Sequence, residues 1–151
     1  MTSSACSLGM RPCCSGTVPS VGASERGDHD ARSCQAVGFV GVSDLDAAQR
    51  FYGDVLGLDL TDARPFALVH DTPAGQLRIT AAEEVRAAPY TVLGWVLEDL
   101  EGEIDRLAAA GVNFHRYDRM SQDERGIGTA PDGARVSWFH DPDGNNLSLQ
   151  S

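Results

Sequence analysis

The sequence contains two degenerate copies of one structural unit, and this repeat constrains the fold more than any other feature. Val-Ser-Asp-Leu at 42–45 resembles Leu-Glu-Asp-Leu at 97–100, 55 positions later. Each segment follows an apolar run, 37–42 in the first copy and 92–97 in the second. An apolar run followed by a polar, helix-starting segment predicts a strand and then a helix in each copy.

Capping residues mark both predicted helices. Ser43 suits the N-cap of the first, with Asp46 three residues later in a capping-box-like arrangement, and Gly57 suits its end. Asp99 is the predicted N-cap of the second helix, and Gly111 its end.

The second half of each copy repeats with a spacing of 70 residues. His70-Asp71 matches His140-Asp141, and Leu77-Arg78-Ile79 matches Leu147-Ser148-Leu149. Further strands are predicted at the following positions: 58–61, 66–69, 112–117 and 134–140. The order is β-α-β-β-β twice, in modules of about 35–88 and 89–151, which predicts an α+β fold whose modules bury apolar sheet faces.

A hairpin turn is predicted at Asp141-Pro142-Asp143-Gly144-Asn145. Proline fixes φ, glycine and asparagine accept positive φ, and aspartate side chains hydrogen-bond nearby backbone N–H groups. Strand-like residues on both sides make this turn the connection between the last two strands.

Composition excludes several classes of partner. The 151 residues include 22 acidic residues and 12 basic ones, all arginine, giving a net charge of −10. Such a charge argues against binding to nucleic acid and to anionic membrane surfaces. No apolar run is long enough to cross a bilayer.

Residues 1–34 differ in composition from the rest and hold all four cysteines: Cys6, Cys13, Cys14 and Cys34. The segment resembles a disordered tail, or upstream sequence read from too early a start, and it lacks the apolar stretch of a secretory signal. The cysteine spacing fits no zinc pattern. Because 35–151 has no cysteine, a reducing, cytoplasmic setting is expected.

Three motifs carry a resemblance to a known family: Phe39-Val40-Gly41-Val42-Ser43-Asp44-Leu45, Arg50-Phe51-Tyr52 with Val55-Leu56-Gly57-Leu58, and the turn at 141–145. In this order, within a βαβββ repeat, they resemble the vicinal oxygen chelate superfamily. That superfamily includes glyoxalase I, bleomycin-resistance proteins, fosfomycin-resistance enzymes and extradiol dioxygenases. The resemblance implies two modules that form a curled mixed sheet around a groove.

The resemblance also implies where metal-dependent members hold their ion, on the first and last strand of each module. Those positions carry Val37, Arg78, Val92 and Ser148 here. Divalent metals need imidazole, carboxylate or thiolate donors, and an arginine repels a cation. We therefore predict no metal at the family position, and no cofactor.

Strand alternation then predicts what lines the groove. The same faces as these four positions carry Phe39, Gly41, Gln76, Thr80, Gly94, Val96, Asn146 and Gln150. The opposite set is uniformly apolar, as packing against helices requires. A mixed wall of this kind suits a small organic molecule, and the predicted ligand-binding residues are Arg78, Phe39, Val37, Val92, Ser148 and Gln150.

Arg78, the histidines and one loop each have two possible interpretations. Arg78 either clamps a carboxylate or phosphate of a ligand, or pairs with a neighbouring acid or extends to the rim. The histidines His70, His115 and His140 either act in acid–base or metal chemistry, or are structural residues at strand ends, which we favour. The loop at 118–133 either covers the groove or lies on the surface.

The resulting hypothesis is a metal-free, glyoxalase-like protein that binds a small molecule as bleomycin-resistance proteins do. The alternative is a metal-dependent lyase or dioxygenase whose metal is held by His70, His115 or His140. The resemblance further implies a homodimer.

Overall fold

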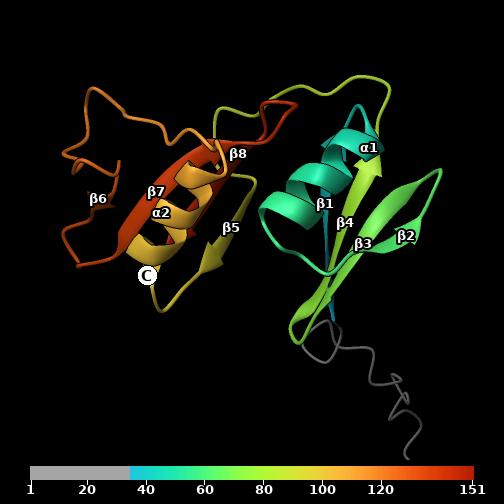
Figure 1. The fold of residues 1–151 in the computed structure, drawn as a ribbon, viewed down its shortest axis with the longest axis horizontal. Helices are drawn as coiled ribbons and strands as arrows, with labels where there is room; N and C mark the ends of the chain where they lie inside the picture. The colour runs from blue at the N-terminus through green and yellow to red at the C-terminus, as the bar shows by residue number, and fades with distance from the viewer. Residues whose placement is uncertain (1–34) are drawn as a thin grey trace, which may run out of the picture. The chain divides into compact units, whose positions relative to one another are not determined.

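A computed structural model describes residues 35–151, and this part of the chain forms two βαβββ modules (Figure 1). The predicted tail, residues 1–34, lies outside the described residues, as do the four cysteines. The contact pattern also makes Gln35–Ser151 one compact unit.

The first module forms a four-stranded sheet in the order β1-β4-β3-β2. Its elements are β1 (Ala36–Val42), α1 (Leu45–Ala48), the π-helix η2 (Gln49–Val55), β2 (Thr61–Ala63), β3 (Ala67–Thr72) and β4 (Gly75–Ala81). Strand β1 runs parallel to β4, and the other pairs are antiparallel. The sheet is therefore mixed, as a crossover from β1 to the last strand requires.

The second module repeats this plan in the order β5-β8-β7-β6. Its elements are β5 (Leu93–Val96), α2 (Leu100–Ala109), β6 (Gly128–Thr129), β7 (Arg135–His140) and β8 (Asn146–Gln150). Gly38 pairs with Leu77 in the first module, and Leu93 pairs with Leu147 in the second. These pairs are related by the spacings of 55 and 70 seen in the sequence, which confirms the repeat.

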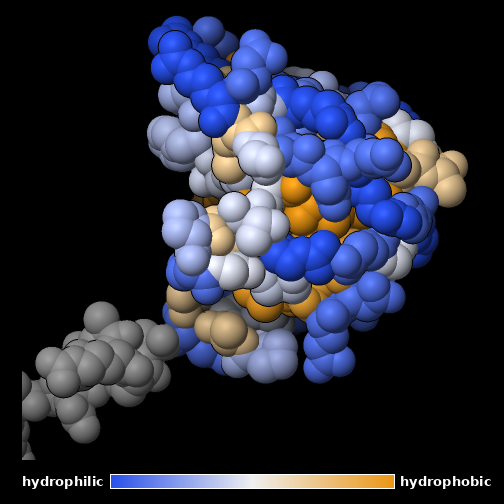
Figure 2. Space-filling model, turned by 90° about the vertical axis from the view of Figure 1, so that its left-hand side faces the viewer, coloured by the Kyte–Doolittle hydropathy of each residue, from blue (hydrophilic) through white to orange (hydrophobic). Residues whose placement is uncertain are grey.

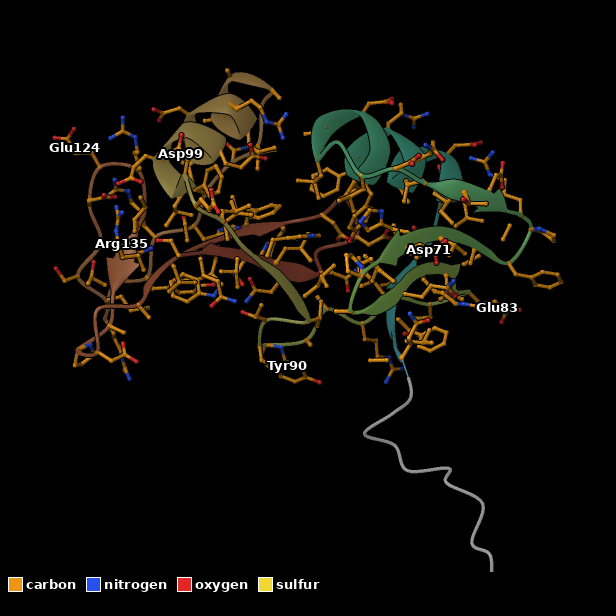
Figure 3. All side chains as sticks on the ribbon, turned by 90° about the horizontal axis from the view of Figure 1, so that it is seen from below. Asp71, Glu83, Tyr90, Asp99, Glu124 and Arg135 are labelled. Atoms are coloured by element: carbon orange, nitrogen blue, oxygen red, sulfur yellow. The ribbon has the colours of Figure 1, made fainter. Side chains whose placement is uncertain are left out.

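The described strands form two separate four-stranded sheets, so the predicted curled sheet is not closed across the modules. Both helices lie on the same side of the sheets (Figure 3). We call the side away from the helices the open face. Tyr90, in the linker between the modules, projects on that side.

The core lies between the sheets and the helices, as the alternation predicted. Its buried members include Val42, Tyr52, Leu68, Ile79, Leu100, Ile104, Leu107, Phe139 and Leu147. Leu93, Trp95 and Leu97 pack against this cluster while partly exposed. The helix-facing register is therefore confirmed for both modules.

The helix ends differ from prediction at one point. Asp44, not Ser43, caps α1, and its carboxylate accepts hydrogen bonds from the backbone N–H groups of Asp46 and Ala47. Ser43 is engaged elsewhere, as described below. Asp99 caps α2 as predicted, and Gly57 and Gly111 adopt φ values of 78° and 93° where the helices end.

The strand predicted at 112–117 is reduced to one isolated bridge between Phe114 and Phe139. Strand β6 pairs with the start of β7 instead. The side chain of Gln122 donates to the carbonyls of His115 and Gly126 and accepts from the N–H of Tyr117. The side chain of Gln122 thus forms hydrogen bonds with backbone groups that neighbouring strands would otherwise pair.

No helix in residues 35–151 has the length and apolar character needed to cross a membrane.

Truncating an apolar side chain to alanine should change the free energy of unfolding differently on the two faces of the sheets. Ile79 is fully buried, so Ile79→Ala should lower the free energy of unfolding by about 2–5 kcal/mol. Val96 is 78% exposed, so Val96→Ala, the control, should change the free energy of unfolding of the monomer by less than about 0.5 kcal/mol. Urea denaturation measures both, and equal losses would contradict the assignment of faces.

Candidate functional site

The open face of the first sheet places Arg78 beside Phe39. The two residues are register partners in the parallel pair β1–β4, so their side chains leave the same face. Phe39 is 66% exposed, and Val37, two residues before it, is 47% exposed. The predicted aromatic ring, guanidinium and aliphatic side chain therefore lie on one face of β1 and β4.

Arg78 has a contact that neither sequence alternative named. Its Nε donates to Oε1 of Gln76 at 2.7 Å, and Nε2 of Gln76 donates to Asp71 at 2.8 Å. Among residues 35–151, no carboxylate lies within ion-pair distance of Arg78. The amide of Gln76 thus stands between the guanidinium and the acid, and orients the guanidinium without neutralising it.

Residues at the centre of the open face of the second sheet are less exposed than those of the first. Ser148 is only 4% exposed and lies against Gly94, its register partner on β5, where any larger side chain would collide with the hydroxyl. Val92 extends the ladder beyond β5 by donating its N–H to the carbonyl of Asn146. Gln150 is exposed at the end of β8. Val92 and Ser148 thus share one face, as Val37 and Arg78 do.

Aromatic residues border this second face, and the sequence did not single them out as site residues. Trp138 faces Ser148 across β7–β8, and its indole Nε1 donates to Oγ1 of Thr91 in the linker. The ring of Tyr117 packs edge-on against Trp138, with centroids 5.4 Å apart. Alternation along β7 was the available signal, because Trp138 is one residue from buried Phe139.

The loop at 118–133 packs on the second module through polar contacts. Arg125 pairs with Asp105 of α2 at 2.8 Å, and Arg135 pairs with Glu101 at 2.6 Å. The guanidiniums hold the pKa of Glu101 and of Asp105 below the ordinary carboxyl range. Figure 2 shows the end of the molecule that carries β6, with polar residues over most of it and apolar atoms between them.

A buried carboxylate organises the junction of the modules. Asp141, 5% exposed, accepts hydrogen bonds from the hydroxyl of Tyr52, the side-chain amide of Asn145, and the backbone N–H groups of Asp143 and Asn145. Its four donors come from the predicted turn and from η2. These four donors satisfy the hydrogen-bonding capacity of a carboxylate that is shielded from water.

The same turn makes two further contacts across the modules. Asp143 accepts hydrogen bonds from the backbone N–H and the hydroxyl of Ser43. The side-chain amide of Asn145 also donates to the carbonyl of Gly41 at 2.8 Å. Ser43 therefore joins the modules instead of capping a helix. The turn at 141–145, one of the three motifs that carry the family resemblance, therefore connects the two modules.

The hydroxyl of Tyr52 is tied to this carboxylate. Burial and the neighbouring charge of Asp141 raise the pKa of Tyr52 far above its usual value, so the hydroxyl keeps its proton and stays a donor. Tyr52 is fully buried, and the sequence gave no signal for its hydrogen-bond partner 89 positions away.

The three candidate histidines do not come together as one group. Nδ1 of His70 lies 2.9 Å from the carbonyl oxygen of Asp59. His140 instead lies against His115, with ring centroids 4.0 Å apart. Both of these rings line a hollow of about 390 Å³ with Phe51, Val55, Asn113, Asp141 and Pro142. Burial and the neighbouring His140 lower the pKa of His115.

The family metal positions offer no donors for a divalent ion. Val37, Arg78, Val92 and Ser148 carry no imidazole, carboxylate or thiolate. Within the described range 35–151, no three or more His, Cys, Asp or Glu side chains are grouped so that they could hold a metal ion. These residues do not fit the ion that the family uses.

Comparison with known proteins identifies the family. Residues 35–149 match the model of the Glyoxalase/Bleomycin resistance protein/Dioxygenase superfamily. The chain belongs to this superfamily. The resemblance to the vicinal oxygen chelate proteins is therefore confirmed. None of the curated proteins matches the sequence.

Solved structures of superfamily members share the fold. A member from Sphaerobacter thermophilus aligns with a TM-score of 0.60 at 22% identity, over 78% of this chain and 96% of that one. A glyoxalase/bleomycin resistance protein/dioxygenase from Alicyclobacillus acidocaldarius gives 0.58 at 21%, over 78% and 90%. The lactoylglutathione lyase from Agrobacterium tumefaciens gives 0.55 at 20%, over 78% and 92%. At these identities the likeness concerns the fold alone.

The contacts at the junction of the modules predict how much stability is lost when the hydroxyl of Tyr52 is removed. Tyr52→Phe keeps the packed ring but removes a donor to the buried charge of Asp141, and should cost about 1.5–3 kcal/mol of stability. Tyr90→Phe is the control, because Tyr90 is 67% exposed. Guanidinium denaturation compares the two, and a loss for Tyr52→Phe no larger than that of the control would contradict the role given to this hydrogen bond.

Proposed function

We propose that this superfamily member binds a small organic molecule on the open face of its sheets, without the metal ion of its catalytic relatives. The observation that carries the proposal is the donor set at the family metal positions, where two valines, an arginine and a serine stand. A lyase or dioxygenase of this superfamily needs an ion there, so ligand binding is the function that fits this chain.

The character of the first open face supports binding of an organic anion. The guanidinium of Arg78 is held by Gln76 through Nε, which leaves its two terminal nitrogens to face a ligand. These two nitrogens can form a bidentate pair with a carboxylate or phosphate. Phe39, opposite Arg78, offers an exposed ring for the apolar part of the ligand. Ligands that combine a flat apolar body with an acid group suit this pair.

The remaining predicted residues extend the same surface. Val37 continues the apolar strip of β1, and Val92, Ser148 and Gln150 provide apolar and hydroxyl or amide contacts on the second sheet. The ligand class, however, is set by Arg78, because a cation on an otherwise acidic chain selects for anions locally.

A thermal-shift screen tests this function. Planar antibiotics and aromatic carboxylic acids are added to the full chain. A ligand at 100 times its Kd should stabilise the folded state by about 2.7 kcal/mol. The absence of stabilisation by every compound class would refute the proposal.

A pair of arginine variants then locates the site. Arg78→Gln should weaken binding of an acidic ligand by about tenfold or more, because a charge-assisted hydrogen-bonded pair contributes about 1.5–3 kcal/mol. Arg86→Gln is the matched control, since Arg86 is exposed and paired with Glu84. Titration calorimetry measures both, and equal weakening would remove Arg78 from the site.

We also propose that the chain forms a homodimer through its open faces. Four apolar side chains are exposed there to the following extents: Val37 47%, Phe39 66%, Val92 37% and Val96 78%. A set of apolar side chains of this kind is characteristic of a surface that another protein covers. A second copy supplies a matching surface, because a two-fold interface uses the same patch on both subunits.

Sedimentation velocity tests the dimer. The wild-type chain should sediment as a dimer, and Val96→Glu should shift it to monomer, because a charge buried in an apolar interface is costly. Phe66→Glu serves as the control, since Phe66 is 74% exposed in the turn before β3. A wild-type chain that sediments as a monomer at tens of micromolar would refute the proposal.

A further inference from the structure

The stacked histidines His115 and His140 form a cluster that the proposed function does not use. Their ring centroids lie 4.0 Å apart at an interplanar angle of 45°. They come from different segments, since His140 ends β7 and His115 follows the isolated bridge at Phe114. The N–H of His115 bonds to the carbonyl of Trp138 at 2.7 Å, which fixes its backbone beside β7.

From this geometry we infer that His115 and His140 form a binding site for a borderline divalent transition-metal ion of the Cu²⁺, Ni²⁺ or Zn²⁺ type. Imidazole nitrogen is a preferred donor for these ions. The site is separate from the family metal positions, which lie on β1 and β4, on β8, and at Val92 just before β5. It is therefore a site additional to the proposed ligand surface.

The distance between the rings of His115 and His140 allows both to bind one ion. Metal–nitrogen bonds are about 2.0–2.1 Å long, so two nitrogens bound side by side lie about 3 Å apart. Rings whose centroids are 4.0 Å apart reach this arrangement by small rotations. His140 is exposed and free to rotate, whereas His115 is half-buried and anchored.

The surroundings favour a cation over an anion. The chain carries a net charge of −10, and Asp141 lines the same hollow. The carboxylate of Asp141 already accepts four hydrogen bonds, so it attracts the ion without serving as a ligand.

The hollow provides room for the rest of the coordination sphere. The hollow has a volume of about 390 Å³, which is enough for water ligands, and Asn113 is among its lining residues. Two protein ligands with exchangeable waters predict moderate affinity, unlike a closed structural zinc site.

The repeat supplies a matched control for this site. His70 is the sequence equivalent of His140 and lies within the equivalent strand β3, but its Nδ1 lies against the carbonyl of Asp59 and it has no imidazole neighbour among the described residues. Replacing His70 therefore removes a histidine of the same origin without touching the pair.

The experiment uses the full chain after alkylation with iodoacetamide. All four cysteines lie in residues 1–34, so this blocks their thiols without altering the described region. Titration calorimetry with NiCl2 and with ZnCl2 should show one ion bound per chain. His115→Ala and His140→Ala should each weaken binding by about tenfold or more, and His70→Ala should leave it unchanged. MgCl2 should not bind, because Mg²⁺ prefers oxygen ligands.

A spectroscopic readout identifies the ligands. The electron paramagnetic resonance spectrum of the Cu²⁺-loaded chain should show coupling to two imidazole nitrogens, reduced to one in either variant of the pair. Binding unaffected by His115→Ala and His140→Ala, or weakened as much by His70→Ala, would overturn the inference. Loss of organic-ligand binding in Arg78→Gln is a separate result, because Arg78 contributes nothing to the metal titration.

Discussion

The buried carboxylate of Asp141 is the constraint on which the rest of the described structure depends. A buried carboxylate is tolerated only when its hydrogen-bonding capacity is met, and four donors meet it here. Two of them are backbone N–H groups of the turn, which fixes the turn. A third is the hydroxyl of Tyr52, which fixes η2 against the second module. The same carboxylate thus sets a local conformation and a contact between modules.

The two modules share one plan but have diverged at their hairpins. His70 lies opposite Leu77, whereas His140 lies opposite Asn146, one position before the residue equivalent to Leu77. A shift of one residue moves a side chain to the other face of a sheet. The equivalent histidines consequently have different neighbours. The two histidines are equivalent in sequence but not in register.

The open faces and the histidine pair offer different chemical groups to a ligand. On the open faces, the positions where the resemblance implies metal ligands hold aliphatic, hydroxyl and guanidinium groups, and the proposed ligand there is an organic anion. The pair of imidazoles lies instead at the end of β7, next to the buried carboxylate. The acidic charge of the chain favours cations there, and the isolated guanidinium of Arg78 favours an anion on the first sheet.

The sequence by itself determined the βαβββ repeat, the face of each strand that is buried, the ends of α2 and the family. Periodicity and turn residues carry this information, because each acts within a few positions along the chain. The prediction that Val37, Arg78, Val92 and Ser148 stand at the family metal positions rests on the resemblance and stays a prediction. Only the tertiary structure decided which polar groups meet: Tyr52 with Asp141, Ser43 with Asp143, Gln76 with Arg78, and His115 with His140. Most of these contacts join distant segments, and local pattern does not encode which partner a buried donor finds.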